Sequence, residues 1–208
     1  MPQLKIGVLV SGGGTNLQSI IDNINLGNIN GSIEIVISNK KDAYGLKRAR
    51  FNNIDAVYVN AKDYEGIEAF NDRIIEELTK RNIDLVVLAG YLKILSQKFI
   101  ATFRNKIINI HPSLIPSFCG KGYYGLKVHE EAIKYGVKVS GATVHFVDEN
   151  ADTGPIILQD VVFIDDNDTA ESLQKKVLQI EHIILPKAVK LFCEGKVQIT
   201  DRKVTVKE

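Results

Sequence analysis

The sequence predicts a single α/β domain built on a twisted, mostly parallel (mixed) sheet with helices on both faces. Short apolar runs rich in Val and Ile, typical of buried strands, alternate strictly with amphipathic helical stretches through the first half of the chain. The 208 residues are 45% hydrophobic and 25% charged, as is typical of soluble globular proteins. No linker-like change of composition, internal repeat or low-complexity segment divides residues 1–208. We therefore expect one Rossmann-like domain over the whole chain.

The first half of the chain is predicted to repeat a strand–helix unit. A nearly continuous apolar run over Leu4–Val10 predicts a buried strand, and a glycine-rich turn separates it from a helix. In that helix Thr15 and Gln18 have the spacing of a capping box. The same reasoning predicts strands at 33–37, 55–59, 84–90 and 106–110, and helices at 44–52, 65–81 and about 92–102.

The pattern changes at residue 139, where two sets of side chains begin to alternate along the chain. This alternation predicts a long strand of the antiparallel type at 139–148, with its partner at 155–164. Asp168 and Glu171 have capping-box spacing at the start of a helix that extends toward Cys193. Pro186 is expected to kink or break that helix, and residues 197–200 and 204–206 are expected to form a terminal hairpin.

Charge and cysteine content exclude several classes of protein. With 26 Lys and Arg against 25 Asp and Glu, the formal net charge is +1, so no overall field attracts nucleic acid or a membrane surface. The N-terminus lacks the pattern of a signal peptide, and no apolar run approaches the roughly 20 residues of a membrane-spanning helix. Cys119 and Cys193 form no CxxC pair, and no histidine has a metal-ligand partner at close spacing. We expect a cytoplasmic protein with structural thiols and no metal.

A glycine-rich loop follows the first strand, with the sequence Ser-Gly-Gly-Gly-Thr-Asn over residues 11–16. Backbone N–H groups at the start of a helix attract anions, so a small phosphate is the ligand that this position favours. The loop is not a dinucleotide fingerprint, because Leu17 stands where the third glycine belongs, and it lacks the Gly-Lys-Ser/Thr of a P-loop. A tight turn without a ligand is the alternative.

Asn109 and His111 lie at the carboxyl end of a predicted strand, where open α/β sheets bind ligands. Residues two apart in a strand share a face, so both side chains point to the same side, and Pro112 keeps His111 extended. An amide donor and an imidazole are the groups that stabilise an oxyanion and move a proton in acyl transfer. The alternative is a histidine that only binds a loop carbonyl.

Further candidates depend on contacts that the sequence does not reveal. Asp148, Glu149 and Asp152 lie in a predicted loop, and one of them becomes catalytic only by contact with His111. On spacing alone, His145 is expected to be a structural hydrogen-bonding residue.

Several motifs together resemble a known family: residues 11–16, Ser38-Asn-Lys40, Val87-Leu-Ala-Gly90, the Asn-Ile-His-Pro-Ser-Leu-Ile-Pro stretch at 109–116, and residues 141–159. The chain resembles the phosphoribosylglycinamide formyltransferases from Lys5 to about Leu191. The resemblance implies the Rossmann-like formyltransferase fold and transfer of a formyl group from the co-substrate 10-formyltetrahydrofolate to the amine of phosphoribosylglycinamide, in de novo purine biosynthesis and without a metal.

The resemblance also implies site residues. It implies catalytic roles for Asn109, His111 and Asp152; phosphate or ribose binding by Gly14, Thr15, Asn16 and Glu181; and folate binding by Leu92, Lys93, Ile94, Leu95, Asn109, Asp148 and Asp152.

Two positions depart from the family pattern. Ile67 stands where many members have an arginine, and Leu178 where they have a lysine or glutamine near the phosphate. Lys62, Lys175 or Lys176 is expected to supply the missing charge.

Other functions remain as alternatives. Formyltransferases that act on methionyl-tRNA and formyltetrahydrofolate hydrolases carry an additional domain, for which we expect no room in 208 residues, and the former need a basic surface. The glycine loop disfavours a nicotinamide-dependent enzyme. A phosphate-binding module without catalysis leaves Asn109, His111 and Asp152 unexplained. We expect small-molecule partners only, with the protein a monomer or homodimer. The glycine-rich segment 119–126 is either a mobile cover or an ordered turn.

Overall fold

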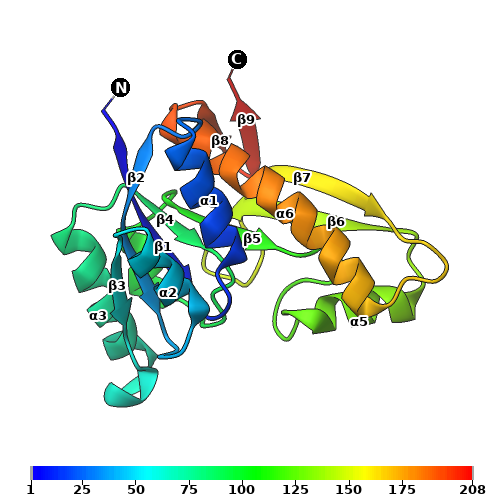
Figure 1. The fold of residues 1–208 in the computed structure, drawn as a ribbon, viewed down its shortest axis with the longest axis horizontal. Helices are drawn as coiled ribbons and strands as arrows, with labels where there is room; N and C mark the ends of the chain where they lie inside the picture. Colours follow the sequence, from blue (N-terminus) through cyan, green and yellow to red (C-terminus); the bar gives the residue numbers. More distant parts are fainter. Residues whose placement is uncertain (1, 208) are drawn as a thin grey trace.

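The strands of the computed structural model form one nine-stranded sheet in the order β3-β2-β1-β4-β5-β6-β7-β9-β8, and the structure describes residues 2–207 (Figure 1). The strands are β1 (Leu4–Val10), β2 (Gly31–Ser38), β3 (Asp55–Tyr58), β4 (Leu85–Leu88), β5 (Ile107–His111), β6 (Val139–Phe146), β7 (Ile156–Phe163), β8 (Val197–Thr200) and β9 (Lys203–Val206). The helices are α1 (Thr15–Asn25), α2 (Tyr44–Phe51), the short 3-10 helix η1 (Ala61–Asp63), α3 (Gly66–Lys80), α4 (Gln97–Thr102), α5 (Leu126–Tyr135) and α6 (Ala170–Cys193).

The sheet is parallel from β3 to β5 and becomes antiparallel at β6, which confirms the predicted mixed sheet. β6 pairs with β5 and β7, both in the antiparallel sense. The direction of winding reverses between β1 and β4, because β2 and β3 lie on one side of β1 while β4 and β5 lie on the other. Ligands of open α/β sheets bind at such a reversal, beyond the carboxyl ends of the strands.

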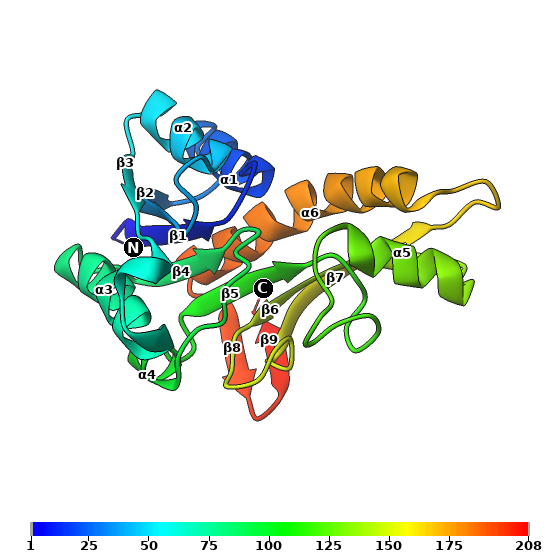
Figure 2. The same cartoon turned by 90° about the horizontal axis from the view of Figure 1, so that it is seen from below.

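Helices cover both faces of the sheet, as predicted (Figure 2). Residues of β1 alternate between the two faces: Ile6, Val8 and Val10 pack in a core with α1, α2 and α6, whereas Leu9 packs in a second core with α3 and α4. All four side chains are fully buried. Burial on both faces explains why β1 is a continuous apolar run without the polar alternation of a half-exposed strand.

Three local predictions were wrong. The N-cap of α1 is Gly14, which has a left-handed φ of 70°. No side chain makes a capping bond there, so the capping box predicted for Thr15 and Gln18 is absent. The capping box of α6 joins Thr169 and Ser172 instead of Asp168 and Glu171. The predicted helix at 92–102 is confined to Gln97–Thr102, because Ser96 caps it by accepting a hydrogen bond from Phe99 N–H.

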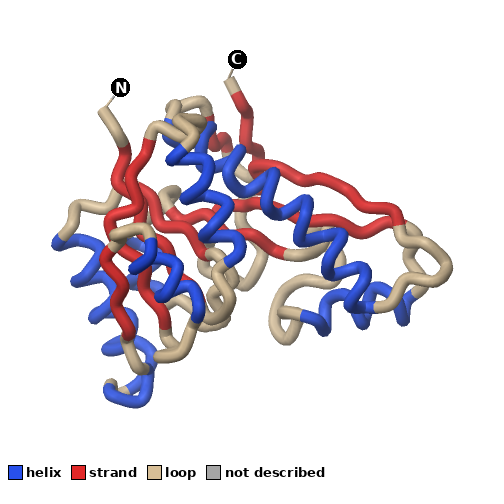
Figure 3. The backbone as a smooth tube through the Cα atoms, viewed as in Figure 1, coloured by secondary structure: helices blue, strands red, loops and turns tan. Residues whose placement is uncertain are grey.

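Helix α6 continues through Pro186, so the predicted break does not occur (Figure 3). Proline removes one N–H donor from a helix, a cost that packing can offset. Pro186 is buried, as are Leu185 and Ala188, and apolar side chains before and after the proline belong to the same core. Tertiary packing on both sides of the proline therefore keeps the helix continuous. The terminal hairpin of β8 and β9 was correctly predicted.

Candidate active site

The glycine loop connects β1 to α1 beside the reversal point of the sheet. Ser11 N–H donates to Gly90 O at 3.0 Å, and the Ser11 hydroxyl donates to Asn39 Oδ1 at 2.6 Å and accepts from Leu92 N–H at 2.9 Å. These bonds tie together the segments that follow β1, β2 and β4. The loop borders a pocket of about 620 Å³, which is lined by residues Ser11, Gly12, Gly13, Asn39, Lys40, Lys41, Asp42, Ala43, Tyr44 and Tyr58.

The first turn of α1 faces α6 through a buried polar pair. Asn16 Nδ2 donates to Glu181 Oε2 at 2.6 Å, and both residues are only 8% exposed. The structure thus brings together two of the residues expected to bind the phosphoribosyl group, which lie 165 positions apart. Burial raises the pKa of Glu181 to about 7, although the bond from Asn16 acts in the opposite direction.

The raised pKa of Glu181 predicts how stability depends on pH. In the unfolded chain a glutamate titrates near 4.5, so between pH 4.5 and 7 the folded protein holds a proton that the unfolded chain has lost. The stabilising effect of that proton is complete below pH 4.5 and is lost as the pH rises through 7. We expect Glu181→Gln, which stays neutral, to melt at a higher temperature than the wild type at pH 8 and at a similar one at pH 4.5. Thermal unfolding followed by circular dichroism at both pH values checks this, and an equal difference in melting temperature at both would contradict it.

Asn109 on β5 contacts His145, its cross-strand neighbour on β6. The register pairs Asn109 with His145, and their side-chain atoms Nδ2 and Nε2 lie 3.1 Å apart. His145 Nδ1 lies 2.7 Å from the carbonyl oxygen of Phe146, so Nδ1 carries the proton and Nε2 accepts from the amide. Burial lowers the pKa of His145, which favours this neutral form. His145 therefore fixes the orientation of the Asn109 amide.

His111, at the end of β5, lies between a backbone carbonyl and a carboxylate. Its Nε2 lies 3.0 Å from Phe118 O, and because a carbonyl only accepts, Nε2 is the donor. Nδ1 faces Asp152 Oδ2 at 3.5 Å. In neutral His111 the Nδ1 lone pair therefore points at a carboxylate, whereas protonation of Nδ1 makes both contacts favourable. The ring is only 6% exposed. This arrangement suits a group that takes up a proton during a reaction.

Asp152 joins the two histidines. Its Oδ2 faces His111 and also accepts from Gly120 N–H at 2.8 Å, while its Oδ1 lies 3.7 Å from His145 Nε2. Asp152 has a left-handed φ of 57°, which aspartate tolerates better than most residues. The three residues expected to be catalytic thus belong to one connected cluster of Asn109, His111, His145 and Asp152. His145 makes hydrogen bonds in this cluster, as expected of a structural hydrogen-bonding residue.

Gly154 allows the loop that carries Asp152 to close tightly. A Cβ at this position would lie 1.8 Å from the carbonyl oxygen of Phe146, a distance that no side chain can occupy. The Phe146 N–H in turn donates to Pro155 O at 2.8 Å. This close backbone approach places the loop between β6 and β7 against the ends of the strands, within reach of His111.

The residues expected to bind the folate differ in their exposure and contacts. Leu92 and Ile94 are 52% and 70% exposed, but Leu95 is only 8% exposed and packs in the core with α3 and α4. Lys93 and Ile94 line a small pocket of about 190 Å³ that also includes Ile67. Asp148 accepts from Asn150 N–H and the Thr153 hydroxyl within its own loop.

Lys176 does not supply a free charge for a phosphate, contrary to one of the expectations. Its Nζ lies 2.6 Å from Asp165 Oδ2 and 2.5 Å from Asp168 Oδ2, at the start of α6. Two carboxylates therefore neutralise this lysine. No helix within residues 2–207 is long and apolar enough to cross a membrane, and no cluster of His, Cys, Asp or Glu in that range could hold a metal ion.

Sequence reasoning missed several partners in the site. His145 pairs with Asn109 only through the antiparallel register, and Phe118 and Gly120 reach His111 and Asp152 from a separate loop. His129, in the first half of α5, is 1% exposed, and its Nδ1 has no hydrogen-bond partner within residues 2–207. Burial, and to a lesser extent the charge of His111, lowers the pKa of His129 to about 4. The alternation of residues 139–147 predicts the strand that carries His145, but not its register with β5.

Comparison with known proteins identifies relatives over nearly the whole chain. Residues 4–189 match the family model described as formyl transferase. A phosphoribosylglycinamide formyltransferase of Haemophilus influenzae is 44% identical over 95% of this chain and 91% of its own length. The trifunctional purine biosynthetic protein adenosine-3 of Chironomus tentans is 43% identical over 97% of this chain, which spans only 14% of that protein.

A solved structure shows the same fold. The glycinamide ribonucleotide transformylase 1 of Symbiobacterium toebii superposes with a TM-score of 0.94 at 44% identity, covering 99% of this chain and 95% of that one. The match to the family model covers well over half of the chain and includes the cluster of Asn109, His111, His145 and Asp152. The chain belongs to the formyl transferase family.

Proposed function

We propose that the protein transfers the formyl group of 10-formyltetrahydrofolate to the amine of phosphoribosylglycinamide, as a step of de novo purine biosynthesis. The observation that carries this proposal is the cluster in which Asp152 contacts His111 and His145, and His145 holds the amide of Asn109. The family membership and the name of the bacterial relative support the same reaction.

In the proposed mechanism the neutral amine attacks the formyl carbon, and a tetrahedral oxyanion forms. The Asn109 amide has one N–H bonded to His145 and a second that can donate to the oxyanion. His111 Nδ1 takes up the proton that the amine loses, and the Asp152 carboxylate stabilises the resulting imidazolium. Collapse of the intermediate breaks the bond between the carbon and the folate nitrogen, and the His111 imidazolium gives its proton to that nitrogen as it leaves.

The two substrates approach the cluster from different sides in this proposal. The phosphoribosyl group lies against Gly14, Thr15 and Asn16, with Glu181 at the ribose. The folate lies against the segment 92–95 and the loop that carries Asp148 and Asp152, consistent with the exposure of Leu92 and Ile94. We also propose a cytoplasmic location, which suits the two free cysteines, and a monomer or homodimer in solution.

A single assay tests the reaction. Formation of tetrahydrofolate from 10-formyltetrahydrofolate is followed spectroscopically with and without phosphoribosylglycinamide. We expect product only when the amine is present. Product formed equally well without the amine would make the protein a hydrolase, and no product in either case would leave a binding protein; both results contradict the proposal.

A further inference from the structure

The C-terminal hairpin of β8 and β9 joins the sheet next to the loop that carries Asp152 (Figure 2). A single bridge pairs Lys203 of β9 with Ile156, the first residue of β7, which begins where that loop ends. The match to the family model ends at residue 189, before the hairpin begins. The family match therefore assigns no role to the hairpin.

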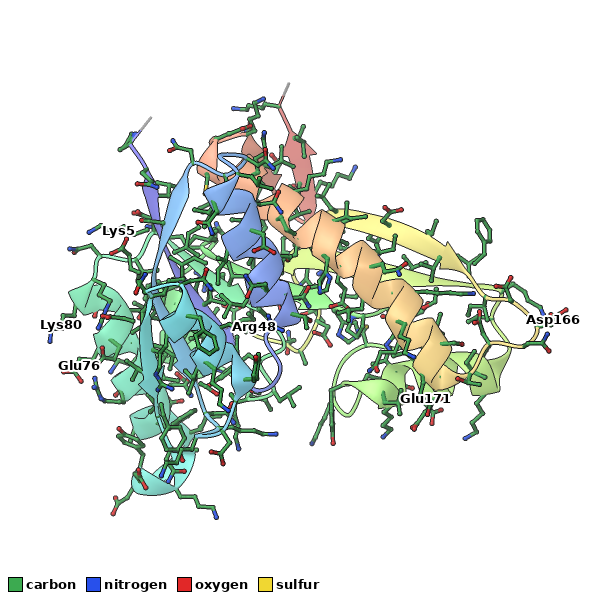
Figure 4. All side chains as sticks on the ribbon, viewed as in Figure 1. Lys5, Arg48, Glu76, Lys80, Asp166 and Glu171 are labelled. Atoms are coloured by element: carbon green, nitrogen blue, oxygen red, sulfur yellow. The ribbon has the colours of Figure 1, made fainter. Side chains whose placement is uncertain are left out.

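One face of the hairpin packs against the body of the protein. Val197, Ile199 and Val204 are partly buried and contact the core that includes α1 and α6. Side chains of the other face extend into solvent, as Figure 4 shows at the red end of the ribbon. The two strands pair in the antiparallel sense over four residues each. These contacts fix the position of the turn that carries Arg202.

Arg202 donates a hydrogen bond to the main chain of the loop. Its Nη2 donates to Thr153 O at 2.9 Å, and the two residues lie 49 positions apart in the chain. Thr153 directly follows Asp152, and its hydroxyl donates to Asp148 Oδ1 at 2.5 Å. A bond from the hairpin therefore holds the residue that adjoins Asp152 and contacts Asp148.

Few other contacts hold the main chain of this loop. At its two ends, the N–H groups of Phe146 and Val147 donate to carbonyl oxygens at 2.8 and 3.0 Å. Between these ends, the bond from Arg202 is the only hydrogen bond within residues 2–207 that joins the main chain of residues 148–154 to another segment. The middle of the loop therefore depends on Arg202 for its main-chain position.

The conformation of Asp152 needs such a contact. Its left-handed φ of 57° is less favourable for an aspartate than the ordinary regions, so the surroundings must hold it. The bond from Gly120 N–H restrains the side chain of Asp152 and not its main chain. The ion pair of Arg104 with Glu149 is exposed on both sides, and such pairs contribute little. Arg202 is thus the contact that restrains the main chain beside Asp152.

We propose that Arg202, carried by the C-terminal hairpin, is a positioning residue for the loop that presents Asp152 to His111 and Asp148 to the folate. This role rests on the proposed function. Without the bond from Arg202 the loop populates other conformations, in which Asp152 does not face His111. Both kcat and KM for the folate should then change. KM for phosphoribosylglycinamide should not, because that substrate is placed on the glycine loop.

The first test compares the two substrates in Arg202→Met. We expect kcat to fall and KM for 10-formyltetrahydrofolate to rise, each by about 3- to 10-fold, while KM for phosphoribosylglycinamide stays within about 2-fold. Arg202→Lys, which retains a charged donor, should recover part of both losses. A general loss of folded protein would lower the apparent kcat and leave both KM values unchanged, and that result would overturn the proposal.

Lys203→Met is the matched control. Lys203 is the next residue in the same hairpin, it is exposed, and its side chain makes no hydrogen bond or ion pair within residues 2–207. Its substitution removes the same charge, so it measures any attraction between the hairpin and an anionic folate. We expect wild-type kinetics. Equal losses in Lys203→Met and Arg202→Met would assign the effect to charge alone and overturn the proposal.

A double-mutant cycle tests whether Arg202 acts through Asp152. In an Asp152→Asn background the carboxylate that Arg202 positions is already gone, so Arg202→Met should lower kcat little further. A further loss of kcat as large as the one in the wild-type background would place the effect of Arg202 elsewhere and overturn the proposal.

A last test does not depend on turnover. Gly120 N–H donates to Asp152 Oδ2, so its hydrogen exchange reports on the position of Asp152. Exchange of this amide, followed by NMR, should be faster in Arg202→Met than in the wild type and Lys203→Met. If the wild type transfers no formyl group but this acceleration is seen, the proposed function fails while the positioning role stands. Equal exchange in all three proteins would overturn the positioning role.

Discussion

Replacing His111 by alanine is expected to lower kcat by a factor on the order of 10²–10⁴ while the protein remains folded. The ring is buried, with Nε2 bonded to Phe118 O and Nδ1 facing Asp152, so alanine removes the group that accepts the proton of the attacking amine. Steady-state kinetics at saturating concentrations of both substrates measure the loss. Circular dichroism and thermal unfolding establish that the variant is folded.

A second substitution separates the chemical role of His111 from its structural one. In His111→Gln the side-chain amide can still donate to Phe118 O, but it cannot take up a proton at neutral pH. We expect His111→Gln to be as impaired as His111→Ala. Recovery of most of the activity in His111→Gln would mean that His111 only anchors the loop at Phe118, and near-wild-type turnover of His111→Ala would remove it from the mechanism.

The sheet and its layers could be predicted because the responsible signals are local. A buried parallel strand such as β1 is a continuous apolar run. Strand β6 alternates between two sets of side chains, although every residue after Val139 is buried, and both patterns are visible within ten residues. The helix start at Gly14 was mispredicted because its cause is not local. Thr15 and Gln18 satisfy the capping pattern, but the close approach of Gly45 requires glycine at the N-cap, and that contact is absent from the local sequence.

The site could be predicted only in part, because its contacts cross the chain. Asn109 and His111 were identified because they share a strand end. The role of His145 depends on a register between β5 and β6, 36 positions apart in the chain for the Asn109–His145 pair. The bond from Gly120 N–H to Asp152 joins two loops 32 positions apart. Neither pairing follows from composition or periodicity, and both require the folded backbone.

The second large effect is expected at Asp152. In Asp152→Asn the side chain keeps its size, and its remaining carbonyl oxygen can still accept from Gly120 N–H, so the loop should keep its conformation. What is lost is the negative charge that faces His111 Nδ1 at 3.5 Å and stabilises the imidazolium. We expect kcat to fall by a factor on the order of 10²–10⁴, with a much smaller change in KM for either substrate.

Asp148→Asn is the matched control for this prediction, because Asp148 belongs to the same loop and its hydrogen bonds are to Asn150 and Thr153. The proposal places Asp148 on the folate side, so its substitution should act chiefly on KM for the folate and leave kcat within a few-fold. A loss of kcat in Asp148→Asn as large as that in Asp152→Asn would point to a general disturbance of the loop. The two variants alter the same loop by the same change of one oxygen for one amide nitrogen. A fall in kcat confined to Asp152→Asn would therefore locate the effect in the negative charge beside His111.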